Sequence, residues 1–371
     1  MALSKNDIWT VVGCGMGGKG LLGELGVNGF RLRAHDRNEA QIAGIRMSGG
    51  LHVEGRDKEF ASVELATTNL AKAVDGAKVI LVSTYGTDIP QVARDLSAHL
   101  QDGQLVLIIQ GHFAGSLVFQ KALADSGCRA RVRIAEFDGY PYMMAVRAPD
   151  RVFMDTYKNH YQLGCRPALE AKEIVGEIRF AFPQVVPASN LLEAGFADVG
   201  ALFHISGMMT NVGRAEAGSP YNFFVPYNFY AANMTPSTCD LIEAMDQERV
   251  LVAQAYGVDT PNVFKWLEAV YDRRDKTLAD RLQANAATHY RDSPAPNSLK
   301  HRFLSGDVPY TIVPIASLGA VAGVSTPVID SVITVCSALT KRDFRADGRN
   351  LANLGIKART VQEVIRAVEA G

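Results

Sequence analysis

Glycines near the start of the chain have the spacing of a turn that binds phosphate groups. Gly13, Gly15 and Gly18 form a G-x-G-x-x-G pattern that also includes Met16 and Gly17. In such a turn the first glycine permits a tight bend and the second lets the backbone approach a pyrophosphate. The third lets a helix pack closely on the preceding strand. Because the first N–H groups of that helix attract phosphate charge, the pattern predicts a dinucleotide site formed by these five residues.

Asp36 and Arg37 occupy the positions that distinguish NAD(H) from NADP(H) in a dinucleotide site. Asp36 lies 18 residues after Gly18, directly after the second predicted strand. In dinucleotide-binding units, a carboxylate at this place binds the adenosine ribose. Its charge would repel a 2′-phosphate, so we predict NAD(H). Arg37 leaves NADP(H) open, because a guanidinium there could stack on adenine or bind that phosphate. The coincidence of glycines, second strand and Asp36 argues against a turn of purely steric origin.

Short apolar segments separated by helical patterns must position this turn. Strands are predicted at 8–12, 30–35, 79–83, 105–109 and 132–135, with helices at about 88–100 and 114–124. This alternation indicates an α/β fold with a doubly wound, Rossmann-type parallel sheet. Ligands of such sheets lie beyond the carboxyl ends of the strands. Thr84 and Gly111 follow two of the strands and are candidates for the cofactor site, although ordinary loop residues would look the same.

Past about residue 187 the chain changes to long helical patterns with few strands. Three Thr-Pro pairs combine an N-cap threonine with a proline suited to the first helical position, at 235–236, 260–261 and 326–327. We predict a dinucleotide-binding domain over residues 1–187, followed by an all-α catalytic or substrate domain over residues 188–371.

The composition is that of a globular chain without a polyanionic partner. Its 371 residues are 47% hydrophobic and 21% charged, with a formal net charge of −1. Nucleic acid and anionic membranes favour a basic face, so we expect neither as a partner, and we find no apolar run long enough to cross a bilayer. The five cysteines are scattered and form no C-x-x-C pair, which argues against disulfides and a zinc site. No metal is expected, and a reducing, cytoplasmic setting fits best.

Two segments of the helical half carry groups that could move a proton or bind a carboxylate. His204 lies in an apolar stretch, where a lone histidine is more often a hydrogen-bonded core residue than a catalyst. Arg302 and Asp307 lie close together just before an apolar helix, where they could also form a surface ion pair of small energetic value. The residue types alone leave both alternatives open.

Several motifs, in order along nearly the whole chain, resemble those of the opine dehydrogenases, the octopine/nopaline dehydrogenase family. The similarity is closest to the bacterial N-(1-D-carboxyethyl)-L-norvaline dehydrogenase type. The motifs are Met-Thr-Pro-Ser at 234–237, Asp-Gln-Glu-Arg at 246–249, Tyr-Arg at 290–291, Arg302 with Asp-Val at 307–308, Val-Pro at 313–314, Thr-Pro-Val-Ile-Asp at 326–330, and Asp-Phe-Arg with Gly-Arg within 343–349. Separate motifs in the right order are far more specific than one glycine pattern.

The resemblance implies an NAD(P)H-dependent opine dehydrogenase, which condenses an α-amino acid with an α-keto acid such as pyruvate and reduces the product to an N-(carboxyalkyl)amino acid. His204 and Asp307 match the family's catalytic histidine and aspartate, and Arg302 matches its substrate-binding arginine. A carboxylate on the imidazole would fix its tautomer, and imidazolium could donate a proton during imine reduction. A planar guanidinium suits bidentate capture of a carboxylate.

An aromatic-rich segment, 220–230, is a further candidate for the substrate site. It contains Tyr221, Phe223, Phe224, Tyr227, Phe229 and Tyr230. We assign Tyr230 to a wall of the substrate pocket, while a core or interface patch would use the same residue types. A homodimer is one assembly that such a chain could form.

Three departures from the family pattern leave the identity of the amine open. They are Ile205 after the histidine, Gly306 before the aspartate, and the pair at 232–233 before the Met-Thr-Pro-Ser motif. Two alternatives to an opine dehydrogenase remain: a two-domain dehydrogenase that reduces a keto acid or ketone without an amine, and a dinucleotide-binding regulator without turnover. A regulator needs no proton-transfer pair, so the presence of both His204 and Asp307 disfavours it.

Overall fold

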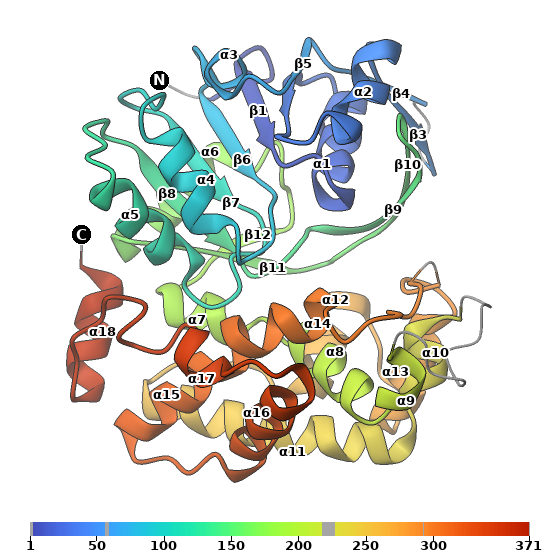
Figure 1. Ribbon diagram of the computed structural model, residues 1–371, viewed down its shortest axis with the longest axis vertical. Helices are drawn as coiled ribbons and strands as arrows, with labels where there is room; N and C mark the ends of the chain where they lie inside the picture. The colour runs from blue at the N-terminus through green and yellow to red at the C-terminus, as the bar shows by residue number, and fades with distance from the viewer. Residues whose placement is uncertain (1–2, 56–58, 217–226, 292, 371) are drawn as a thin grey trace. The chain divides into compact units, whose positions relative to one another are not determined.

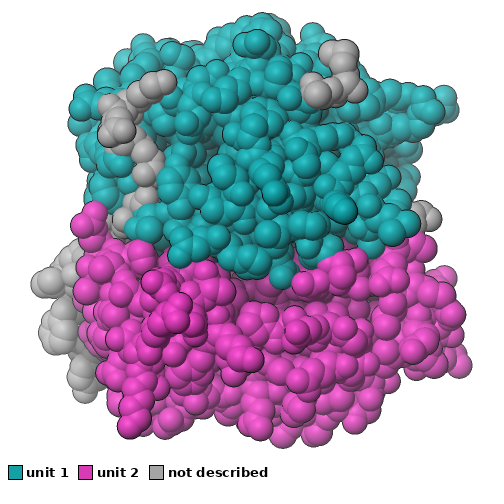
Figure 2. Space-filling view, turned by 180° about the vertical axis from the view of Figure 1, so that it is seen from behind, with its two compact units in different colours: residues 1–111, 115–188 teal, residues 112–114, 189–371 magenta. Residues whose placement is uncertain are grey.

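A computed structural model describes residues 3–55, 59–216, 227–291 and 293–370 (Figure 1). The chain divides into two compact units (Figure 2). Unit 1 comprises residues 1–111 and 115–188, and unit 2 comprises residues 112–114 and 189–371. Residues 112–114, which follow a strand of unit 1, thus belong to unit 2.

Unit 1 is built on an eight-stranded sheet in which six consecutive strands are parallel. Its strands are β1 (Ile8–Val12), β2 (Arg31–His35), β5 (Leu65–Thr67), β6 (Val79–Val82), β7 (Leu105–Ile108), β8 (Arg133–Phe137), β11 (Tyr161–Cys165) and β12 (Val185–Pro187). The spatial order is β12-β11-β8-β7-β6-β1-β2-β5. The six strands from β5 to β8 are parallel and follow the 3-2-1-4-5-6 order of a dinucleotide-binding Rossmann sheet. The predicted α/β fold is confirmed.

Alternating side chains of these strands build two hydrophobic cores, one on each face of the sheet. Val79 and Leu81 of β6 belong to one core, whereas Ile80 and Val82 belong to the other. Helices on the first face are α1 (Met16–Val27), α2 (Glu39–Ser48) and α6 (Ala171–Ile178); helices on the second are α3 (Leu70–Val74), α4 (Ile89–Leu96) and α5 (Gly115–Asp125). All four side chains of β6 are buried, because a central strand covered on both faces must be apolar throughout.

A second sheet, which the sequence patterns did not predict, packs on α1. In spatial order it consists of β4 (Phe60–Ser62), β3 (Gly50–Glu54), β10 (Arg151–Tyr157) and β9 (Tyr142–Ala148). Glycines on α1 allow the close approach: a Cβ on Gly20 would lie 2.9 Å from Met144, and one on Gly23 would lie 2.8 Å from Val152. In the large sheet, β11 runs antiparallel to β8, so the parallel part ends at β8.

Unit 2 is helical, as predicted. Its helices are α7 (Leu191–Phe196), α8 (Gly200–Met209), α9 (Val212–Ala215), α10 (Phe229–Asn233), α11 (Pro236–Ala255), α12 (Val263–Tyr271), α13 (Leu278–Ala286), α14 (Arg302–Ser305), the π-helical turn η2 (Val308–Ile312), α15 (Val313–Ala322), α16 (Pro327–Thr340), α17 (Phe344–Asp347) and α18 (Val361–Glu369). Within the described part of this unit, the only β pairing is an isolated bridge between Asn228 and Pro294.

Two of the three predicted Thr-Pro helix starts are correct. Thr235 is the N-cap of α11 and accepts a hydrogen bond from the Thr238 amide, and Thr326 is the N-cap of α16. The third prediction is wrong: α12 begins two residues later, with Asn262 as its N-cap. The hydroxyl of Thr260 instead accepts a hydrogen bond from Arg249, so a tertiary contact overrides the local capping signal.

One helical stretch of unit 2 is long and apolar enough to cross a membrane, so the expectation that the chain has no such run was wrong. The stretch is Arg302–Ala322, and 78% of its most apolar window is buried inside the protein. Burial of this extent is typical of a core helix, whose apolar side chains contact the rest of the fold.

Candidate active site

The glycine-rich turn joins β1 to α1 and leaves open space beside its second glycine. Gly15 is the N-cap of α1, and no side chain in the described parts of the chain caps the first N–H groups, those of Met16 and its neighbours. Gly13 has a φ of +95°, and a Cβ on Gly18 would lie 1.8 Å from the Gly13 carbonyl oxygen, so strand and helix meet only if both are glycine. A Cβ on Gly15 would meet nothing within 4 Å. The space and the uncapped amides fit a pyrophosphate.

Thr84 and Gly111 lie at the carboxyl ends of neighbouring strands but differ in what surrounds them. A Cβ on Gly13 would lie 2.8 Å from Thr84 Cγ2, so Thr84 is beside the glycine-rich turn. Its Oγ1 is buried without a hydrogen-bond partner in the described ranges, which leaves a donor for a bound molecule. Gly111 lies against β8, where a Cβ would be 2.7 Å from Glu136 Oε2.

The Asp36 carboxylate is held at the end of β2 by two backbone amides. Its Oδ2 accepts a hydrogen bond from the Cys14 amide at 2.8 Å, and its Oδ1 accepts one from the Asn38 amide at 2.8 Å. Asp36 thus ties the glycine-rich turn to β2 and is fixed where its carboxylate could accept hydrogen bonds from a ribose. Arg37 is exposed, and its guanidinium lies 3.3 Å from Asp88. Such a surface pair is worth little and leaves the guanidinium free to turn.

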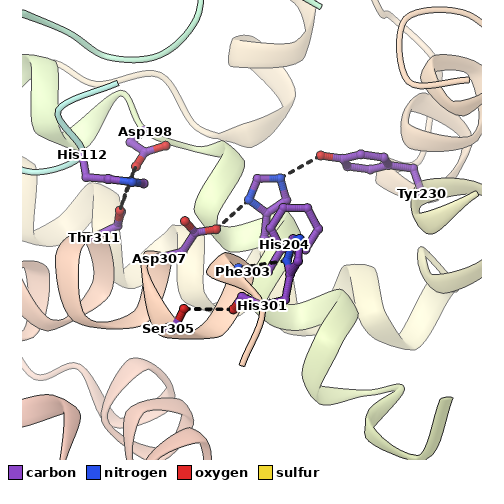
Figure 3. A network of polar contacts seen from close by, with 9 residues as sticks. All are labelled: His112, Asp198, His204, Tyr230, His301, Phe303, Ser305, Asp307 and Thr311. Carbon is purple, nitrogen blue, oxygen red and sulfur yellow. Dashed lines mark hydrogen bonds and ion pairs between the residues drawn. The ribbon is translucent and has the colours of Figure 1, made fainter. Parts of the chain in front are cut away.

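Unit 2 brings His204 and Asp307 together, although 103 positions separate them in the chain (Figure 3). His204 Nδ1 lies 2.6 Å from Asp307 Oδ2, and His204 Nε2 lies 2.9 Å from the Tyr230 hydroxyl. Both members of the pair are buried, with 8% of His204 and 1% of Asp307 exposed. Asp307 directly precedes η2, and short π-helical turns of this kind occur frequently at functional sites.

An aromatic stack holds the imidazole in place. The rings of His204 and Phe303 lie 3.7 Å apart and are inclined by only 8°. Phe303 belongs to α14, one turn before Asp307, so one short segment supplies both the ring that supports His204 and the carboxylate that bonds to it. On the other side, Tyr230 stacks on Tyr290 at 4.1 Å. Packing of this kind restrains a side chain in one rotamer, as a reactive group requires.

Burial decides the protonation of this group. It lowers the pKa of His204 and outweighs the attraction of the Asp307 carboxylate. Burial opposes ionisation of Asp307, but His204, followed by His112 and the Arg302 guanidinium, nevertheless holds the pKa of its carboxyl below the usual value. The pair is therefore an ionised carboxylate with a neutral imidazole at pH 7. Nδ1–H donates to Asp307, and Nε2 accepts from Tyr230, whose pKa is raised by burial.

Arg302 presents a cation beside the pair. Its guanidinium carbon lies 4.8 Å from the centre of the Phe303 ring, in the geometry of a cation–π contact. No described residue forms an ion pair or a hydrogen bond with this guanidinium. An arginine beside a buried histidine, without an ion-pair partner among the described residues, is suited to a carboxylate of a bound molecule.

A second polar cluster, which the sequence did not predict, lies in the same unit (Figure 3). Asp198 Oδ2 accepts hydrogen bonds from His112 Nδ1 at 3.0 Å and from the Thr311 hydroxyl at 2.7 Å. His112 follows Gly111 and was a candidate for the cofactor site by its place after a strand, but nothing in the sequence relates it to Asp198 and Thr311. We name these three residues the Asp198 cluster.

Of the aromatic segment singled out in the sequence, the part containing Tyr221, Phe223 and Phe224 lies outside the described residues. Phe229 and Tyr230 are buried in α10. Phe229 contacts both His204 and Phe303, with ring centres 6.4 and 5.0 Å away. Tyr230 contacts the catalytic candidate His204 directly, while Phe229 forms part of the core behind it.

Comparison with known proteins identifies the family. A family model described as NAD/NADP octopine/nopaline dehydrogenase, alpha-helical domain, matches residues 187–340. The opine dehydrogenase of Arthrobacter sp. (strain 1C) is 30% identical over 366 residues, which cover 98% of this chain and 99% of the relative. The chain belongs to the opine dehydrogenase family. It is therefore an NAD(P)-dependent oxidoreductase acting on the CH–NH group, as the sequence predicted.

Solved structures of the opine dehydrogenase family share the fold. Octopine dehydrogenase, in complexes with NADH and L-arginine and with NADH and pyruvate, matches with TM-scores of 0.74 and 0.73 at 18% identity, covering 99% of both chains. Yersinopine dehydrogenase with bound NADP⁺ matches with a TM-score of 0.71 at 14% identity, covering 98% of both chains. The predicted combination of a Rossmann-type domain and a helical domain is thus the fold of these enzymes.

Proposed function

We propose that this opine dehydrogenase condenses an α-amino acid with an α-keto acid such as pyruvate and reduces the product to an N-(carboxyalkyl)amino acid. The observation that carries the proposal is the buried hydrogen bond between His204 and Asp307, 2.6 Å long. A ketone reduction that needs no amine is the alternative. The similarity to a structure holding L-arginine and another holding pyruvate supports the condensation.

The overall reaction requires one proton besides the hydride. Amine, keto acid, reduced cofactor and one proton yield the secondary amine, the oxidised cofactor and water. His204 first takes up that proton to become imidazolium, and then donates it from Nε2 to the substrate oxygen that leaves as water. The hydride comes from the bound nicotinamide. In the oxidative direction neutral His204 accepts the proton at the same atom.

Asp307 and Tyr230 prepare His204 for this role. Asp307 accepts from Nδ1–H, so it fixes the tautomer and stabilises the imidazolium. Tyr230 remains protonated because burial raises its pKa, and its hydroxyl lies 2.9 Å from Nε2. The substrate oxygen takes the place of this hydroxyl, or receives the proton through it, which gives Tyr230 its role in substrate binding.

Arg302 binds a substrate carboxylate. Both substrates and the product carry carboxylates, and this guanidinium has no ion-pair partner within the described parts of the chain. Its place over Phe303, the ring that also supports His204, brings the bound carboxylate close to the proton donor. A planar fork fixes a carboxylate in one orientation, which a point charge does not.

In unit 1, Gly13, Gly15, Met16, Gly17 and Gly18 would hold the pyrophosphate. Asp36, Arg37, Thr84 and Gly111 would surround the rest of the dinucleotide. We propose NADH as the preferred cofactor, because Asp36 is fixed by two amides and its charge repels a 2′-phosphate. The exposed Arg37 is the residue that would favour NADPH instead.

The experiment is a substrate grid with the purified protein. Oxidation of NADH and NADPH is followed across pairs of amino acids and keto acids, and each substrate is omitted in turn. We expect oxidation only when both substrates are present, a product whose mass shows reductive loss of water, and a higher kcat/KM with NADH. Equal oxidation with a keto acid alone would replace the proposal by the amine-independent reduction. A clear preference for NADPH would reverse the cofactor assignment alone.

A further inference from the structure

The Asp198 cluster is a second buried histidine–carboxylate group in the helical unit. Asp198 and His112 are 5% and 7% exposed, and Thr311 is 1% exposed. One carboxylate oxygen, Oδ2, accepts both hydrogen bonds, from His112 at 3.0 Å and from Thr311 at 2.7 Å. Nothing in the proposed reaction uses these three residues, yet burying an ionisable group is costly unless hydrogen bonds or opposite charges compensate it.

The other oxygen of Asp198 and the ring of His204 approach the same backbone position. Asp198 lies two residues before the start of α8, and His204 lies in the middle of that helix. An ideal Cβ on Gly200 would be 4.0 Å from Asp198 Oδ1 and 4.0 Å from His204 Cε1, so both atoms approach one backbone position. Thr311 lies four residues after Asp307, in the same turn of η2, so the two carboxylates are held by one short segment.

The backbone that carries His112 adopts a conformation that is unfavourable for its residue types. Gln110, His112 and Ala114 have φ values of 60°, 58° and 56°, in the left-handed region that residues other than glycine rarely adopt. The Phe113 amide donates to the Tyr310 carbonyl at 3.0 Å, so a contact within unit 2 keeps residues 112–114 in place. A fold retains such conformations where the surroundings determine them strongly, often at functional sites.

We propose that Asp198, held by His112 and Thr311, is a positioning residue that stabilises the protonated form of His204. The proposal rests on the proposed function, in which His204 must carry a proton to the substrate. Asp198 does not touch the reacting atoms. It acts through its charge, since a carboxylate in a poorly solvated site favours a neighbouring cation over distances at which water would screen it.

The charges around His204 explain why a second carboxylate is needed. Burial and the Arg302 guanidinium both oppose protonation of the imidazole. Asp307 favours it through its hydrogen bond, and Asp198 favours it from the start of α8. Of the other titratable neighbours, Tyr230 and His301 are neutral, because burial raises the pKa of Tyr230 and lowers the pKa of His301 to about 4. His112 faces Asp198 and donates a hydrogen bond to it. Without Asp198, Asp307 alone would favour protonation of His204 against both burial and the Arg302 guanidinium.

The test compares Asp198→Asn and Thr311→Val with a matched control, Thr326→Val. Thr326, which is 4% exposed, also donates a hydroxyl hydrogen bond to an aspartate, Asp330, in the same unit. The pKa of His204 is measured by NMR titration of ¹⁵N-histidine protein without substrate, with its signal assigned through a His204→Asn variant. The alkaline limb of the pH–rate profile for reduction is recorded in parallel.

We expect Asp198→Asn to lower the pKa of His204 by about 0.5–1 unit, since a charge that favours the imidazolium is removed. Thr311→Val should shift it in the same direction by less, and Thr326→Val should leave it unchanged. The alkaline limb of the reductive profile should move to lower pH by the same amounts. Because Thr311→Val removes one oxygen from a buried site, it also provides a test if Asp198→Asn does not fold.

An unchanged His204 pKa in the folded variants would overturn the inference and leave Asp198 a purely structural residue. The titration needs no turnover, so its outcome is separate from that of the substrate grid. A shifted pKa without amine-dependent turnover supports the coupling of Asp198 to His204 and overturns the proposed function alone. Amine-dependent turnover with an unchanged His204 pKa supports the proposed function and overturns the coupling of Asp198 to His204.

Discussion

The planar guanidinium of Arg302 is central to the proposed binding of a substrate carboxylate. Its guanidinium lies over Phe303 and has no ion-pair partner in the described parts of the chain. We predict that Arg302→Lys lowers kcat/KM by a factor equivalent to about 1.5–3 kcal/mol, because an ammonium cannot form the paired hydrogen bonds of the planar fork. Steady-state kinetics with each substrate varied in turn would measure the loss.

The control for this substitution is Arg274→Lys. Arg274 is exposed and pairs with Glu268 and Asp272 in the same unit, so its replacement should leave the kinetics unchanged. NADH affinity should be the same in both variants. Wild-type kinetics in Arg302→Lys would mean that the guanidinium is structural.

At this scale the sequence predicted His204, Arg302 and Asp307 because they lie in motifs of an opine dehydrogenase. It could not predict Asp198 or Thr311 as their neighbours. Neither residue has a distinctive spacing, and their hydrogen bond spans 113 positions, so only the folded helices bring them together. A contact of this kind leaves no local signal in a single sequence.

Among the elements, α1 offers a test that separates folding from cofactor binding. Gly15 has space around it and a φ of −66°, which alanine adopts without strain. We predict that Gly15→Ala folds normally but weakens NADH binding by about tenfold or more, equivalent to about 1.4 kcal/mol, because its methyl group occupies the place of the pyrophosphate. Fluorescence titration with NADH and a thermal melt without it would measure the two effects.

Two other glycines provide controls for Gly15→Ala. Gly176 is in the interior of α6 with nothing near its ideal Cβ, so Gly176→Ala should stabilise the protein by about 0.5–1 kcal/mol and leave NADH binding unchanged. Gly18→Ala should destabilise it, since the methyl group would collide with the Gly13 carbonyl oxygen. Unaltered NADH binding in Gly15→Ala would show that the cofactor does not approach the turn closely.

The start of α16 depends on a side chain from another helix. Glu248 of α11 accepts hydrogen bonds from the Val328 and Ile329 amides at 2.8 and 2.9 Å. We predict that Glu248→Gln costs about 1–3 kcal/mol, because one amide loses its acceptor and the helix loses a negative charge at its N-terminus. The midpoint of urea denaturation would measure this cost.

The matched control is Glu363→Gln, which alters the exposed capping box of α18 in the same unit. Its loss of stability should be smaller, since water can satisfy the exposed groups. Equal losses in the two variants would contradict the special role of Glu248. Sequence patterns found the threonine and proline at this helix start but not the carboxylate, since Glu248 comes from a segment 80 positions away.

The elements that the sequence failed to predict share a physical cause. β3, β4, β9 and β10 form a separate sheet on α1, and β4 has only three residues. Exposed positions interrupt the apolar pattern of β9, whereas the four residues of β6 are all buried and apolar. Patterns reveal strands that are covered on both faces more readily than half-exposed ones.

For the whole molecule, the order of strands and helices was enough to predict a Rossmann-type unit followed by a helical one. Right-handed crossovers between parallel strands leave few arrangements for such an order. The assignment of residues 112–114 to unit 2 was not predictable, because it depends on where His112 and Phe113 find their hydrogen-bond partners. The family resemblance supplied what the pattern could not, namely which distant side chains act together.

The central claim is that unit 2 builds one acid–base group from His204 and Asp307, and a double-mutant cycle tests it most directly. The kcat of amine-dependent NADH oxidation is measured at saturating substrates for wild type, His204→Ala, Asp307→Asn and the double variant. We predict a loss of about 10²–10⁴-fold for His204→Ala, a large loss for Asp307→Asn with NADH binding retained, and a double variant hardly worse than His204→Ala alone. Losses that multiply in the double variant would contradict the account, because they would mean that the two residues act independently.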